Sequence, residues 1–122
     1  MNISVIIASR NREVHIKNLL KDLTEQSYLP SEIIVVDQSE TPYKDLSCIH
    51  IIDQGIGPCR ARNLGASHAI GDILVFLDDD VRLDLDFLEL LCTPILRGNY
   101  SAACGAICDS QGNYQIPQYA AW

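Results

Sequence analysis

Apolar and polar positions alternate along this chain in blocks that are typical of strands. Five short apolar runs are each followed by a polar or turn-forming segment, and the first of them is rich in β-branched residues. Runs of this length and composition predict β-strands. The predicted strands are Ile3–Ala8, Glu32–Val36, Cys48–Ile52, Asp72–Leu77 and Tyr100–Cys108.

Between these runs, apolar residues recur at helical spacing. The predicted helices are Glu13–Gln26, Cys59–Ile70 and Asp84–Leu96. Asn11 and Asp84 stand where side chains cap the first and third helices, and Gly71 is a typical helix stop after the second. Helices that separate apolar strands predict an α/β fold with a mostly parallel sheet. The second and third strands follow one another without a clear helix.

The run Ile73–Leu77 ends abruptly in three carboxylates, Asp78, Asp79 and Asp80, called here the acid cluster. We expect this strand to be buried on both faces, as in a parallel sheet. Adjacent carboxylates repel one another, so a bound cation would stabilise their ionised forms. Oxygen ligands of this kind suit Mg²⁺ or Mn²⁺. The alternative is a loop of solvated acids.

Other predicted strands also end in polar residues. Ser9-Arg10-Asn11, Asp37 and Asp53 follow the first three strands, and the acid cluster follows the fourth. Because parallel strands bring their carboxyl ends to one edge, we expect these groups to line a ligand crevice. Polar loops alone would give the same pattern, an alternative that applies best to Asp53.

Arg60 and Arg62 begin the second predicted helix, directly after the turn Gly55–Pro58. Guanidinium groups and free backbone N–H groups at a helix start bind phosphate, so these arginines are candidates for an anion site. A solvated helix face with salt bridges is the alternative. An EF-hand loop at the acid cluster is excluded, because its fifth and sixth positions hold Arg82 and Leu83.

Composition limits the classes of partner. The chain has 122 residues, 48% of them hydrophobic and 20% charged, which predicts one folded domain. Its net charge of −7 argues against nucleic-acid or anionic-membrane surfaces. The five scattered cysteines suggest reduced, buried thiols. No basic segment precedes the first apolar run, so we expect no signal peptide and a cytoplasmic protein.

Four blocks together carry a family resemblance: I-S-V-I-I-A-S-R-N-R, I-I-V-V-D-Q-S, G-P-C-R-A-R-N-L-G-A and I-L-V-F-L-D-D-D-V. In this order and spacing they resemble the N-terminal half of a family 2 glycosyltransferase of the GT-A fold. The resemblance runs from Ile3 to about Leu96. It implies a Rossmann-like three-layer sandwich whose N-terminal half binds a nucleotide-sugar donor.

The resemblance also implies roles for particular residues. Ala8 and Arg10, with Ser9 nearby, would line the nucleoside pocket, and Asp37 would lie beside the base and ribose. The acid cluster would be the DxD motif: Asp80 would bind Mg²⁺ or Mn²⁺ with help from Asp78, and Asp78 or Asp79 would hold ribose. The expected nucleotide-sugar-binding set is Ala8, Ser9, Arg10, Asp37, Gln38, Arg60, Arg62, Asp78 and Asp79.

Two departures from the family pattern bear on function. Gln38 stands where the family usually has a second acid, which leaves the choice of nucleotide open among UDP, GDP and dTDP. The acceptor half and the catalytic base of an inverting transferase would lie beyond Trp122, so we expect the chain to be part of a longer enzyme. Its acceptor, a glycan or a lipid-linked molecule, and any peripheral contact with the inner membrane face would depend on those missing parts.

Two other functions remain open at this stage. One is a non-catalytic nucleotide-sugar-binding module or degenerate transferase. The other is a metal-dependent phosphate-handling enzyme, against which the lack of any lysine after Asp80 counts.

Overall fold

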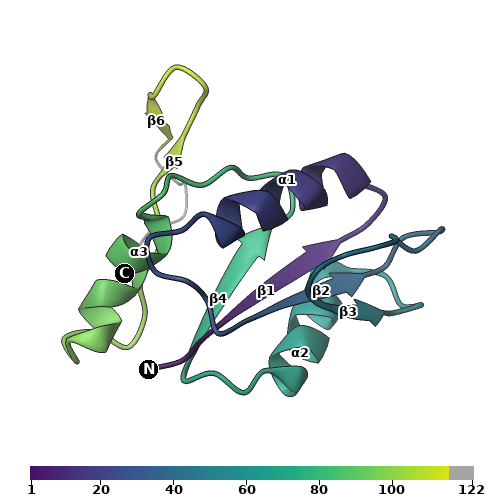
Figure 1. Ribbon diagram of the computed structural model, residues 1–122, viewed down its shortest axis with the longest axis horizontal. Coiled ribbons are helices and arrows are strands. Elements are labelled where there is room, and N and C mark those ends of the chain that lie inside the picture. Colours follow the sequence, from purple (N-terminus) through teal and green to yellow (C-terminus); the bar gives the residue numbers. More distant parts are fainter. Residues whose placement is uncertain (116–122) are drawn as a thin grey trace. The chain divides into compact units, whose positions relative to one another are not determined.

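A four-stranded parallel sheet forms the centre of the first of two units, Met1–Leu90 and Leu91–Trp122. The computed structural model describes residues 1–115. The strand order across the sheet is β3-β2-β1-β4 (Figure 1). The bounds are β1 Ile3–Ser9, β2 Glu32–Asp37, β3 Ile49–Ile52 and β4 Ile73–Asp78.

The first strand of the chain lies in the middle of this sheet. β1 pairs in parallel with β2 on one side and with β4 on the other, so that Ala8 is level with both Val36 and Asp78. Residues Ile3 to Ile7 are all buried, which explains why both faces of this strand are apolar or small. The register brings the carboxyl ends of β1, β2 and β4 to one edge of the sheet.

Helices α1 (Glu13–Thr24) and α2 (Pro58–His68) lie on opposite sides of the sheet (Figure 1). α1 buries an apolar stripe of Ile16, Leu19, Leu20 and Leu23. α2 packs closely through Ala61 and Gly65: a Cβ atom added to Gly65 would lie 2.5 Å from Cγ2 of Ile6. These layers confirm the predicted α/β class, and the predicted element order is confirmed as far as α3.

The prediction that the strand before the acid cluster is buried on both faces is wrong. In β4 burial alternates, and residues Leu74 and Phe76 are 41% and 47% exposed. The reason is position: among the described residues β4 pairs with β1 alone, so it forms an edge of the sheet. An apolar run of five residues does not distinguish an edge strand from a central one.

The two predicted N-caps, Asn11 and Asp84, are wrong. Asn11 has φ 54° and lies one residue before the N-cap, Arg12; its backbone N–H and side-chain oxygen bond Ser39 and Glu40 instead. Helix α3 (Phe87–Leu96) begins after Asp84, whose carbonyl accepts a hydrogen bond from the amide of Phe87. The conformation of Asn11 is therefore set by its hydrogen bonds to the loop after β2 and not by capping of α1.

The second unit contains a small antiparallel hairpin, β5 (Ile107–Cys108) and β6 (Tyr114–Gln115). The carboxylate of Asp109 accepts hydrogen bonds from the backbone amides of Gln111 and Asn113 and so closes its turn. The predicted strand Tyr100–Cys108 is thus reduced to two residues, which pair with β6 and not with the parallel sheet. The apolar end Ala120–Trp122 lies outside the described residues.

Two further predictions concern surfaces and membranes. All five cysteines are free, but Cys59, Cys104 and Cys108 are exposed, so the expectation of buried thiols is wrong for these three. Within residues 1–115, no helix has the length and apolar character needed to cross a bilayer.

Candidate nucleotide-binding site

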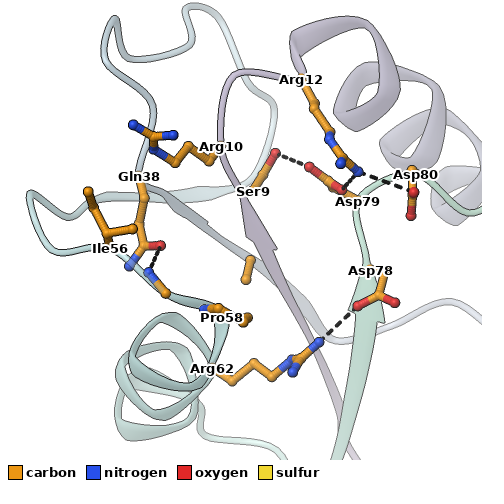
Figure 2. Close-up of a pocket in the computed structure, with 12 residues that line it drawn as sticks. Ser9, Arg10, Arg12, Gln38, Ile56, Pro58, Arg62, Asp78, Asp79 and Asp80 are labelled. Atoms are coloured by element: carbon orange, nitrogen blue, oxygen red, sulfur yellow. Dashed lines mark hydrogen bonds and ion pairs between the residues drawn. The ribbon is translucent and has the colours of Figure 1, made fainter.

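A pocket of about 370 Å³ opens where β1, β2 and β4 end (Figure 2). It is of the size that small-molecule ligands occupy. Of the residues expected to bind nucleotide-sugar or metal, eight line it: Ala8, Ser9, Arg10, Gln38, Arg62, Asp78, Asp79 and Asp80. Arg12 and the segment 56–58 complete the lining.

The acid cluster divides into two exposed carboxylates and one buried one. The side chains of Asp78 and Asp80 are 64% and 50% exposed, whereas that of Asp79 is 9% exposed. Asp79 accepts hydrogen bonds from the Ser9 hydroxyl at 2.8 Å and from the Arg12 guanidinium at 3.2 Å. Its two oxygens are therefore already occupied by the protein, while Asp78 and Asp80 face the opening.

Arginines from both helical layers neutralise these acids. A single guanidinium nitrogen of Arg12 lies 3.2 Å from Asp79 and 3.1 Å from Asp80. Arg62 extends from α2 across the pocket and donates to Asp78 at 2.8 Å (Figure 2). Each carboxylate of the acid cluster thus has an arginine partner, and each arginine lines the pocket.

The donor set of the acid cluster fits a hard divalent cation. The Arg12 guanidinium already places positive charge between the carboxylates of Asp79 and Asp80. Across the described part of the chain, no three acidic, histidine or cysteine side chains form a ready-made metal cage. Mg²⁺ is commonly held by one or two carboxylates together with substrate phosphates, an arrangement that does not need such a cage.

A second polar network supports the other wall of the pocket. Gln38 donates to Asp53 at 2.9 Å and accepts from the backbone N–H of Gly57 at 3.1 Å. Arg60 binds both oxygens of Asp53, at 2.9 and 3.0 Å. These bonds from Arg60, followed by that from Gln38, hold the pKa of Asp53 well below its usual range. Arg60 consequently faces Asp53 and does not line the pocket.

Asp37 also lies behind the pocket wall. It is fully buried and accepts hydrogen bonds from the backbone amides of Ser39 and Tyr43, at 2.9 and 2.8 Å, and from His50 at 2.9 Å. Burial raises the pKa of Asp37, but these hydrogen bonds together outweigh it and keep the pKa below its usual value. Asp37 therefore holds the loop after β2 in place.

The segment after the acid cluster is fixed from α1. Asp22 accepts two hydrogen bonds from the Arg82 guanidinium, at 2.7 and 2.8 Å, and a third from the backbone N–H of Leu83 at 3.0 Å. The bond to Arg82 is the main cause of the lowered pKa of Asp22. Sequence reasoning missed this anchor, as it missed Arg12 and Tyr43, because their partners lie far away along the chain.

The sequence model of the family described as Glycosyl transferase family 2 matches residues 4–119. An uncharacterized glycosyltransferase of Haemophilus influenzae is 32% identical over 125 aligned residues, which cover 91% of this chain and 50% of that protein. The chain therefore belongs to glycosyl transferase family 2. It spans only half the length of that relative.

Solved structures agree on the fold. S. aureus TarS matches 97% of this chain with a TM-score of 0.73 at 22% identity, and the chain covers 23% of it. A structure of TarS 1–349 in complex with UDP also matches, with 25% identity and a TM-score of 0.62. That match covers 80% of this chain and 32% of the TarS chain. A third structure is that of glucosyl-3-phosphoglycerate synthase from Mycobacterium tuberculosis in complex with Mn²⁺, UDP and glucosyl-3-phosphoglycerate. The match covers 78% of this chain and 39% of that chain, with 24% identity and a TM-score of 0.57. The predicted GT-A fold is confirmed.

Proposed function

We propose that this chain binds a nucleoside-diphosphate sugar at the pocket and presents the sugar for transfer to an acceptor hydroxyl. The observation that carries the proposal is the pairing of exposed carboxylates with arginines at the ends of parallel strands, in a chain of this family. Such a site offers ligands for a cation and donors for phosphate within one pocket.

The two exposed acids, Asp80 and Asp78, would hold Mg²⁺ or Mn²⁺. When bound, the metal supplies positive charge that offsets the charge developing on the leaving diphosphate. Arg12 and Arg62, now paired with the acid cluster, are within the same pocket and would turn to the phosphate oxygens. Asp79 is buried and keeps its hydrogen bond from the Ser9 hydroxyl in this proposal.

The nucleoside would occupy the other end of the pocket, beside Ala8, Arg10 and Gln38. The Gln38 amide is held in one orientation by Asp53 and Gly57, so it presents a fixed edge to a base. UDP is the first nucleotide to test, since two of the solved relatives contain it. An inverting displacement would additionally need a base to activate the acceptor.

The test is a titration of UDP, GDP and dTDP, each with and without Mn²⁺, followed by calorimetry or NMR. We expect one nucleotide to bind in a metal-dependent way. Asp80→Asn should remove the metal dependence. Asp86→Asn, which changes an exposed acid outside the pocket, should leave it intact. If no nucleotide binds, the proposed function is wrong; if Asp80→Asn binds as the wild type does, Asp80 is not the metal ligand.

A non-catalytic binding module is the second candidate. It is favoured by one observation: within the described residues, the acids that line the pocket all belong to the acid cluster, which leaves no separate carboxylate to act as a base. Sugar transfer to any acceptor by a longer version of the protein would exclude this alternative.

A further inference from the structure

Tyr43 connects three groups of the site through its hydroxyl. The backbone N–H of Arg12 donates to Tyr43 Oη at 2.9 Å, and Tyr43 Oη lies 2.7 Å from Ser9 Oγ. Ser9 has one hydroxyl proton, which it donates to the Asp79 carboxylate at 2.8 Å. Tyr43 must therefore donate to Ser9, because the Ser9 proton is already used. The hydrogen bonds run in one direction, from Arg12 through Tyr43 and Ser9 to Asp79.

The backbone of Tyr43 is tied to Asp37, which lies behind the pocket wall. Its N–H donates to Asp37 at 2.8 Å, and its ring stacks on that of His50 with centroids 6.4 Å apart. His50 in turn bonds the same carboxylate oxygen of Asp37. Tyr43 is 6% exposed and does not line the pocket, so it can act on a ligand only through these neighbours.

We propose that Tyr43 is a positioning residue that sets the acid cluster and the start of α1 for binding of the metal and diphosphate. By holding Ser9, it fixes the buried Asp79, and so the backbone from which the exposed Asp78 and Asp80 project. By accepting from the Arg12 amide, it fixes the base of the side chain that reaches Asp79 and Asp80. This inference rests on the proposed function for the identity of the ligand. The hydrogen bonds from which it is argued do not depend on that function.

The hydroxyl alone carries this role, which makes it separable from packing. Phenylalanine at position 43 would keep the ring stacked on His50 and the amide bonded to Asp37. It would leave the Arg12 amide without its acceptor and Ser9 without its donor. The nucleoside end of the site should therefore remain intact while the phosphate end loosens.

The experiment compares wild type, Tyr43→Phe and Tyr28→Phe by NMR titration with uridine and with UDP plus Mn²⁺. Tyr28 is a matched control, because its hydroxyl makes an exposed bond to the Met1 carbonyl. For Tyr43→Phe we expect UDP–Mn²⁺ affinity to fall by roughly fivefold or more, because the two hydrogen bonds of the Tyr43 hydroxyl are lost. Uridine affinity should stay within about twofold. Tyr28→Phe should match the wild type in both.

Equal losses for uridine and UDP–Mn²⁺ would mean that Tyr43 merely supports the fold, and unchanged UDP–Mn²⁺ affinity would also overturn the inference. Amide hydrogen exchange of the free chain provides a second measurement that needs no ligand. Exchange at Arg12 should be faster in Tyr43→Phe than in either wild type or Tyr28→Phe. If exchange there is unchanged, the inference fails. If the wild type binds no nucleotide while exchange at Arg12 responds as expected, the proposed function fails and the positioning geometry stands.

Discussion

At the scale of single side chains, the acid cluster is held by arginines. Arg12 bonds Asp79 and Asp80 through one nitrogen, and Arg62 bonds Asp78. A cation that enters the cluster must compete with these guanidinium groups for the same oxygens. Binding of metal and of diphosphate should therefore be coupled, since the metal frees the arginines that the phosphates use.

This competition predicts the effect of Arg12→Gln. Without nucleotide, the variant should bind Mn²⁺ about two- to fivefold more tightly, because half-exposed ion pairs are worth up to about 1 kcal/mol. In the presence of Mn²⁺, the variant should bind UDP more weakly. Free Mn²⁺ can be followed by electron paramagnetic resonance.

Lys17→Gln is the control for Arg12→Gln, because Lys17 lies on the same helix and pairs at 3.3 Å with Glu13, away from the acid cluster. It should change neither affinity. Weaker Mn²⁺ binding by Arg12→Gln would contradict the competition.

Part of the site could be predicted from the sequence, because the end of a strand is marked by an apolar run that gives way to polar residues. The acid cluster and the residues at the end of β1 follow apolar runs, and parallel pairing gathers them at one edge. Arg62 was predicted from its place in the helix that follows the turn Gly55–Pro58. Tyr43 carried no such signal, since it lies in a polar loop and its role depends on Ser9, 34 positions away. Asp37 and Arg60 were expected at the ligand but face protein partners, which only the folded arrangement reveals.

At the scale of elements, close packing of α2 on β1 sets the distance between Arg62 and the acid cluster. Gly65 provides this closeness, because any side chain there would meet Ile6. The sequence block R-A-R-N-L-G contains both Arg62 and this glycine.

The periodicity of apolar residues was enough to predict which helices and strands exist. It could not predict the helix caps or the exposure of β4, because these depend on neighbouring parts of the fold.

Gly65→Ala tests this packing. In a free helix the change would stabilise by up to about 1 kcal/mol. Here we expect a loss of about 1–3 kcal/mol in the free energy of unfolding, because the added methyl overpacks the interface. Asn63→Ala, at an exposed position of the same helix, should be neutral or slightly stabilising. Urea unfolding would contradict the prediction if Gly65→Ala were as stable as Asn63→Ala.

The hydrogen bonds from Arg82 and Leu83 to Asp22, which join the segment after β4 to α1, predict that the free energy of unfolding depends on pH. At pH 7, Asp22→Asn should lower the free energy of unfolding by about 1–3 kcal/mol, because charged hydrogen bonds to Arg82 and Leu83 are lost. The pKa of Asp22 is lowered from 3.8, so its stabilisation is present above that value and lost as the pH falls through the lowered pKa.

The difference in unfolding free energy between wild type and Asp22→Asn should accordingly shrink below about pH 3.8. Chemical unfolding at pH 7 and near pH 3 measures it, with Asp86→Asn as the control. A difference that grows in acid would show that the pair is not ionised as described.

At the scale of the whole molecule, the chain spans half the length of the Haemophilus influenzae relative and 32% of the UDP-bound TarS chain. We expect the 122-residue chain to bind its nucleotide but to transfer no sugar, because the described pocket supplies donor ligands and no separate base. A transfer assay with a labelled UDP-sugar and a panel of acceptors tests this. Turnover by the isolated chain would contradict it.

The central position of β1 also affects how the protein emerges from the ribosome. β1 is synthesised before its partner β4 and must wait for it, as the bond between Ser9 and Asp79, 70 positions apart, illustrates. At roughly 5–20 residues per second, this leaves an apolar strand without one neighbour for several seconds. The parallel sheet can therefore close only after residues beyond β4 have left the exit tunnel.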